Sequence, residues 1–188
     1  MLLCALFVSG CGYHFTGTVS RLPAHVRSIH VGPIANETRE AELGRELAFA
    51  LEREILRRGT FRLAESPSEG DAVISGKIHS VELRPVAFDS RDQALQYELA
   101  VEADLRLEDR GTGETLWAVE NLRQTDEYSA SARVVVTSSS RFQRGRLEPR
   151  DLRGLTDIQL AESDESEAFR RAVEGLARRA YVLMVEGF

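Results

Sequence analysis

The stretch ALQYELAVEADLRLED, residues 94–109, decides the fold class of this chain. An alternation of apolar and polar residues places one face of a β-strand in a core and the other face in water. A sheet covered on both faces would show continuous apolar runs instead, so this stretch predicts an antiparallel sheet that is open to solvent on one side. The alternating apolar residues are Leu95, Tyr97, Leu99, Val101, Ala103, Leu105 and Leu107.

The next stretch extends this sheet by a hairpin. The sequence DRGTGE, residues 109–114, has the composition of a hairpin turn. Residues 115–128 then form the return strand, which brings Trp117 and Val119 back across the same sheet. The polar second half of this strand indicates an edge, or a part that projects beyond the core.

Three further strands precede the hairpin. Short strands are expected at residues 27–31, which Pro33 should end, and at residues 61–64. A longer strand is expected at residues 72–83, where the apolar residues change parity, which predicts a β-bulge with Gly76 as the candidate position. The residues that change parity are Ile74 and Ile78 against Val81 and Leu83.

Two amphipathic helices complete the predicted domain. Residues 40–58 repeat an apolar residue every four positions, with Asn36 and Thr38 as candidate N-caps and Gly59 as the end. A second helix follows Asp164, which has capping-box spacing to Glu167. The first stripe contains Leu43, Leu47, Leu51 and Ile55, widened by Ala48, Ala50 and Leu56, and the second contains Phe169, Val173, Leu176, Ala180 and Leu183.

These elements predict an α+β fold with the order β-α-β-β-β-β-α. We expect a two-layer sandwich in which both amphipathic helices pack on one face of a mixed, mostly antiparallel sheet of about four strands. Between the last strand and the last helix, residues 129–162 lose periodicity and become rich in arginine. A long connection of this kind inside a compact domain is usually functional or disordered.

The N-terminus resembles a bacterial lipoprotein signal. An apolar run ends in Val8, Ser9 and Gly10, directly before Cys11, as in the lipobox whose cysteine is acylated and becomes the new N-terminus. The alternative is a short buried strand with an ordinary core cysteine. We therefore expect a signal peptide at residues 1–10, a lipidated tether at 11–24 and a single domain at 25–188. The mature domain would have no disulfide, and its covalent lipid on Cys11 would be its only attached group.

Composition and motifs argue against several function classes. Thirty acidic residues against twenty-four basic ones speak against nucleic acid as a partner. No metal-ligand spacing, nucleophile elbow or phosphate loop is present, so we expect no catalytic residues, no metal and no enzyme activity. Apart from the signal, no apolar stretch approaches the length that spans a bilayer.

Short motifs along the chain resemble the LptE family of lipopolysaccharide-assembly lipoproteins. They are CGYHF at residues 11–15, IHVGPIANET at 29–38, LRRGTFRL at 56–63 and DAVISGKI at 71–78. The resemblance implies an outer-membrane lipoprotein, anchored at the periplasmic face in the inner leaflet, that plugs the LptD β-barrel and assists the insertion of lipopolysaccharide into the outer leaflet.

Arginines are the candidates for contact with the glycolipid, because guanidinium groups pair with phosphates through two hydrogen bonds. We chose those on strand ends or in the arginine-rich connection. They are Arg84, Arg91, Arg123, Arg133, Arg141, Arg144 and Arg146.

Two other interpretations stay open. Lipoproteins of the curli-secretion or penicillin-binding-protein-activator kind show a similar strand, amphipathic helix and strand, which would make this chain a periplasmic scaffold or a secretion-pore component. A periplasmic enzyme or small-molecule binder would need convergent polar residues in a pocket, and the sequence shows none.

Overall fold

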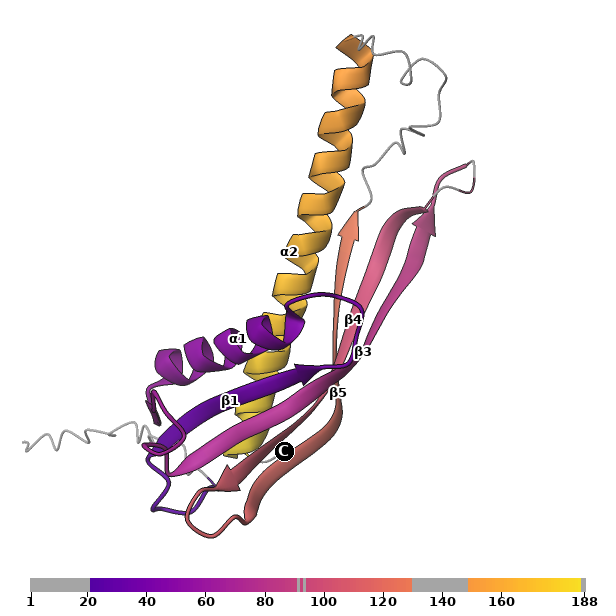
Figure 1. The fold of residues 1–188 in the computed structure, drawn as a ribbon. Helices are drawn as coiled ribbons and strands as arrows, with labels where there is room; N and C mark the ends of the chain where they lie inside the picture. The colour runs from indigo at the N-terminus through magenta and orange to yellow at the C-terminus, as the bar shows by residue number, and fades with distance from the viewer. Residues whose placement is uncertain (1–20, 91, 93, 130–148, 187–188) are drawn as a thin grey trace, which may run out of the picture.

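The computed structural model describes residues 21–90, 92, 94–129 and 149–186, and in the last helix the side chains are described from Asp164 onward. These residues form the predicted α+β domain in the predicted order (Figure 1). The elements are β1 (Ser28–Asn36), α1 (Leu43–Arg58), β2 (Arg62–Leu63), β3 (Ala72–Phe88), β4 (Ala94–Asp109), β5 (Thr115–Ser129) and α2 (Pro149–Glu186).

The sheet is mixed and has five strands among the described residues, where the sequence predicted about four. Its order is β2-β1-β3-β4-β5, with β1 parallel to both neighbours and β3, β4 and β5 antiparallel. The short strand predicted at residues 61–64 is β2, which is two residues long and pairs with β1 at the edge of the sheet, because α1 returns the chain to that edge as a crossover.

Both helices pack on one face of the sheet, as the alternation in β4 predicted. Leu99, Val101 and Leu107 of β4 are fully buried. They meet Leu47 of α1 and Leu176 of α2, which are also fully buried. None of the helices in the described ranges lies on the opposite face, so this part of the chain is a two-layer sandwich with one open side (Figure 1).

Two details of the strands differ from prediction. Pro33 does not end β1, because the pairing with β3 shifts between Val31 and Ile34 and the strand continues to Asn36. A bulge of this kind accommodates proline, which cannot donate to the ladder. The predicted bulge in β3 is present between Ile78 and Ser80 rather than at Gly76.

The start of α1 also differs from prediction, whereas its end is as expected. Its N-cap is Glu42, which has φ 72° and makes no side-chain capping bond. Asn36 and Thr38 hydrogen-bond to each other in the preceding loop instead. Gly59 ends the helix in the left-handed conformation, with φ 67°. Leu56, expected to widen the buried stripe, is 62% exposed.

The last helix is longer than predicted. It begins at Pro149, so residues 149–162 of the expected connection are helical and Asp164 lies inside the helix rather than at its start. Proline suits the first position of a helix, because its φ is already helical and its missing N–H would have no partner there. The remainder of the expected connection, with the expected signal peptide and all but the end of the tether, lies outside the described residues.

Part of the sheet projects beyond the rest of the domain. The pairing of β1 with β3 ends at Asn36 and Ile78, after which β3, β4 and β5 continue without β1. We call this part the extension, and it comprises residues 80–88, 94–102 and 123–129. The extension and the first turns of α2 project past α1 (Figure 1).

Candidate functional site

Paired charges cover the open face of the sheet. The register places Arg123 opposite Glu102, and their charged atoms lie 2.6 Å apart. Closer to β1, Lys77 pairs with Glu37 at 3.2 Å. Further along β4, Arg106 Nε lies 3.1 Å from Glu108 Oε1. Each of these cations has a carboxylate partner. The opposite charges within each pair therefore largely cancel, and this part of the face has little net charge.

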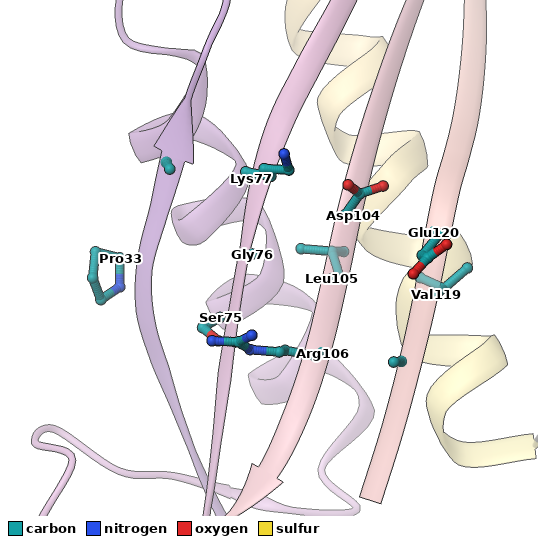
Figure 2. Close-up of a pocket in the computed structure, with 11 residues that line it drawn as sticks. Pro33, Ser75, Gly76, Lys77, Asp104, Leu105, Arg106, Val119 and Glu120 are labelled. Carbon is teal, nitrogen blue, oxygen red and sulfur yellow. The ribbon is translucent and has the colours of Figure 1, made fainter. Parts of the chain in front are cut away.

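A shallow groove of about 490 Å³ crosses this face (Figure 2). Its floor is made by small residues, which allow the hollow because they rise little above the backbone. Charged side chains of β3, β4 and β5 surround the floor (Figure 2). The floor includes Pro33, Ala35 and Ala118 together with the backbone of Gly76, and the surrounding charged residues are Lys77, Asp104, Arg106 and Glu120.

The glycine in this floor reflects a close approach of two strands. A Cβ atom added to Gly76 would overlap the carbonyl oxygen of Asp104 and lie 2.7 Å from Leu105 Cδ2. Leu105 thus takes the space that a side chain at position 76 would need. Glycine is required here by packing, rather than by the bulge that the sequence predicted.

Two of the predicted glycolipid-binding arginines lie in the extension and share one carboxylate. Arg84 Nη2 lies 2.6 Å from Glu82 Oε2, and Arg123 Nη1 lies 3.4 Å from the same oxygen. The hydrogen bond from Arg123 to Glu102, with a further one to Glu82, raises the pKa of the Arg123 guanidinium. Both arginines are therefore occupied by protein carboxylates, and a phosphate would have to displace them.

The remaining predicted site residues lie outside the described part of the chain. Cys11, the predicted lipidation site, lies outside the described residues. So do the other five arginines, and for these the glycolipid contact stays a prediction. They are Arg91, Arg133, Arg141, Arg144 and Arg146.

Apolar side chains are exposed at the tip of the extension, which the sequence analysis did not identify as a site. Val86 is 47% exposed, Phe88 55% and Leu95 47%. Deeper in the extension, Tyr97 and Tyr128 stack with ring centroids 5.7 Å apart. The sequence contained one signal for this surface. Leu95 belongs to the alternating apolar residues, but it lies at the start of the strand, before the residues that are fully buried.

A hydrogen-bond cluster fixes the opposite end of β4. Asp109 accepts hydrogen bonds from the backbone N–H groups of Gly111 and Thr112 at 2.8 and 2.9 Å, which closes the hairpin turn. His25 Nε2 donates to the other carboxylate oxygen at 2.5 Å. The hydrogen bond from His25 and those from the turn lower the pKa of Asp109 to about 2.

The described ranges contain neither a candidate membrane-spanning helix nor a candidate metal cluster. No helix there is long and apolar enough to cross a bilayer. No group of three or more histidine, cysteine, aspartate or glutamate side chains in these ranges is arranged to hold a metal ion.

Comparison with known proteins identifies one family. The family model described as "LptE: Lipopolysaccharide-assembly" matches residues 26–182, which is most of the chain. No curated protein matches the chain.

Several solved structures are similar to parts of this chain. A putative lipoprotein from Caulobacter crescentus is 16% identical, with a TM-score of 0.47 over 80% of this chain and 86% of that chain. Lipoprotein B from Nitrosomonas europaea is 16% identical, with a TM-score of 0.44 over 92% of each chain. PelC from Paraburkholderia phytofirmans, solved as a dodecamer, is 19% identical, with a TM-score of 0.41 over 58% of this chain and 76% of that chain.

Proposed function

This chain belongs to the LptE family of lipopolysaccharide assembly, and from this premise we propose that it is a lipid-anchored subunit of the outer-membrane barrel LptD. In this role it plugs and supports the barrel at the periplasmic side of the outer membrane. It assists the passage of lipopolysaccharide to the outer leaflet by contact alone, so the role requires no covalent chemistry.

The observation that carries the proposal, beside the family match, is the shape and surface of the extension. It is a narrow three-stranded ribbon that projects past α1 (Figure 1). The carboxylates of Glu82 and Glu102 neutralise Arg84 and Arg123 on its open face. A polar surface with internally paired charges suits the lumen of a large barrel, because entering the lumen leaves these charges paired.

The exposed apolar tip supports the same orientation. Exposed apolar residues at the end of a projecting ribbon are candidates for contact with a partner. Val86, Phe88 and Leu95 are all about half exposed at the end of the extension. We place this tip against the inner wall of the barrel, with α1 and β2 left towards the periplasm.

Glycolipid contact belongs to the same proposal. Arginines in and beyond the extension would pair with phosphates of lipopolysaccharide. Arg84 and Arg123 would have to exchange Glu82 and Glu102 for phosphate, which makes the arginines of residues 130–148 the stronger candidates. Replacement of Arg141, Arg144 and Arg146 together by alanine should weaken the binding of purified lipopolysaccharide, and unchanged affinity would remove them from the site.

The test is an affinity pull-down of the full-length lipoprotein from detergent-solubilised outer membrane. We expect a stoichiometric large β-barrel, identified by mass spectrometry, and an N-terminal peptide that begins with acylated Cys11. Phe88→Ser with Leu95→Ser should reduce the recovered barrel, whereas Ser66→Ala in an exposed loop should not. Recovery of a ring of identical subunits without a barrel would instead favour a secretion-pore component.

A further inference from the structure

A second exposed apolar surface lies on α1, away from the extension. Phe49 is 58% exposed and Leu56 is 62% exposed. They are seven positions apart, so they lie on the same face of the helix, with Arg53 between them. We call Phe49, Arg53 and Leu56 the α1 stripe. It points away from the buried stripe, so the sheet does not account for it.

Arginines continue this surface into the groove between the two helices. Arg53, Arg57 and Arg178 line a hollow of about 270 Å³ together with Glu54 and Glu174. The two carboxylates are engaged, since Glu54 accepts hydrogen bonds from Arg57 and Glu174 lies 3.2 Å from Arg53.

The hollow between the helices carries one positive charge in excess, because three arginines face two glutamates there. Arg178 has no ion-pair partner among the residues that the structure describes. Glu46 and Glu52 flank the α1 stripe on the helix. The excess positive charge is therefore confined to the hollow beside the C-terminal half of the stripe, where Arg53 and Arg178 lie. The surface therefore combines exposed apolar side chains with a cationic groove.

The same region lies close to the point where the chain enters the domain. The backbone N–H of Arg21 donates to the carbonyl of Val185 in α2 at 3.0 Å. One turn earlier in α2, the ring of Tyr181 lies under the Arg58 guanidinium at 5.5 Å, which joins the end of α1 to this site. Cys11 precedes Arg21 by ten positions, which limits their separation to about 35 Å.

From these observations we propose that the α1 stripe docks on the phospholipid surface of the leaflet that holds the lipid anchor, with Phe49 and Leu56 in the interface and the helix-groove arginines against anionic headgroups. The inference rests on the proposed lipidation of Cys11. An amphipathic helix that lies in the interface gains affinity from its apolar area and from attraction to anionic lipids.

Docking through α1 would give the anchored domain a fixed orientation. A short tether keeps the helix at a high effective concentration near the membrane, so a weak surface contact is sufficient. The extension projects past α1 and stays free when α1 lies on the leaflet (Figure 1). The tip would thus be presented to the barrel while the base of the domain rests on the bilayer.

The experiment measures vesicle binding by the mature chain from residue 11 with Cys11→Ser, so that no acyl chain contributes. Partition coefficients are determined by flotation with phosphatidylglycerol-containing vesicles and with pure phosphatidylcholine vesicles. We expect Phe49→Ser with Leu56→Ser to lower the coefficient about tenfold. Arg53→Gln with Arg178→Gln should remove the preference for the anionic vesicles.

The matched control is Phe88→Ser with Leu95→Ser, which removes a phenylalanine and a leucine of similar exposure from the tip of the extension. This control should leave the coefficient unchanged. Circular dichroism verifies that every variant is folded, as expected for substitutions at exposed positions. Equal binding by wild type and the α1 variant, or an equal loss in the tip control, would overturn the inference.

The proposed function and this inference fail separately. Vesicle binding is measured without any barrel, and the pull-down is measured without vesicles. If the α1 variant fails to recover the barrel in the pull-down and the wild type does not bind vesicles, the barrel rather than the membrane covers the α1 stripe, and this inference is wrong. If the wild type binds vesicles through the stripe but recovers no barrel, only the proposed function falls.

Discussion

Replacement of Gly76 by alanine tests whether the central contact between β3 and β4 is as close as the structure shows. The new Cβ would overlap the Asp104 carbonyl oxygen, lie 2.7 Å from Leu105 Cδ2 and lie 3.0 Å from Leu105 Cα. Two of these three atoms belong to the backbone of the neighbouring strand, so a rotamer change of Leu105 cannot relieve the overlap. The two strands must separate locally.

The expected magnitude follows from two opposing effects. Overpacking of a closely packed core costs about 1–3 kcal/mol. Alanine in a strand is more favourable than glycine by roughly 0.5–1 kcal/mol, because a chain with alanine has less conformational freedom to lose on folding. Because the overlap is with backbone atoms, the overpacking cost should be near the upper end, about 2–3 kcal/mol. The net loss in the free energy of unfolding is then about 1–2.5 kcal/mol, which lowers Tm by about 2–10 °C in a domain of this size.

The assay is urea denaturation followed by circular dichroism, together with thermal unfolding. Gly32→Ala in β1 is the control, since its Cβ would lie 3.1 Å from Ile74 O and 3.4 Å from Val73 Cγ1, which a small shift can relieve. We expect the control to stay within about 0.5 kcal/mol of wild type. If Gly76→Ala is as stable as the control, the strands do not approach as described and the reasoning is wrong.

Three further predictions concern stability. Leu176→Ala should lower the free energy of unfolding by about 2–5 kcal/mol in urea titrations, because this side chain is fully buried, whereas the 62% exposed Leu56 should tolerate alanine. The pKa of Asp109 is about 2 in the folded protein and 3.8 for the free group, so the stability that its carboxylate contributes is present above pH 3.8 and is lost as the pH falls through 2. Asp109→Asn should remove the loss of stability over this pH range, and His25→Ala should make that loss smaller, both measured by urea titrations at several pH values. Glu54→Gln should cost about 1 kcal/mol in the same titrations, since this 5% exposed carboxylate accepts charged hydrogen bonds from two arginines.

Strand prediction succeeded where the pattern was longest. The strand at residues 94–109 has the predicted bounds, because one face of it is buried by helices and the other is wet over most of its length. The shorter strand at 27–31 was ended too early at Pro33, since local sequence cannot show that a bulge places this proline where no ladder bond is needed.

The candidate site was less accessible from sequence. Arg84 and Arg123 were chosen because they lie on strand ends or in the arginine-rich connection, but both pair with Glu82. Arg84 is two positions from Glu82 in the same strand, whereas strand register brings Arg123 to it from 41 positions away. The exposure of Leu56 was also missed. Leu56 follows Ile55 of the buried stripe by one position, which turns its side chain by about 100° towards the face that carries Phe49 and away from the sheet.

Sequence alone determined the α+β class, the order of the elements, one wet sheet face and the family resemblance, because each of these follows from local periodicity or from short motifs. Tertiary structure alone decided the projection of the extension past β1, the pairing of charges across the open face and the exposure of Phe49 on α1. These features depend on which strands stop pairing and on which helix face meets the sheet. Both are set by contacts between residues far apart in the chain, and local sequence patterns contain no information about such contacts.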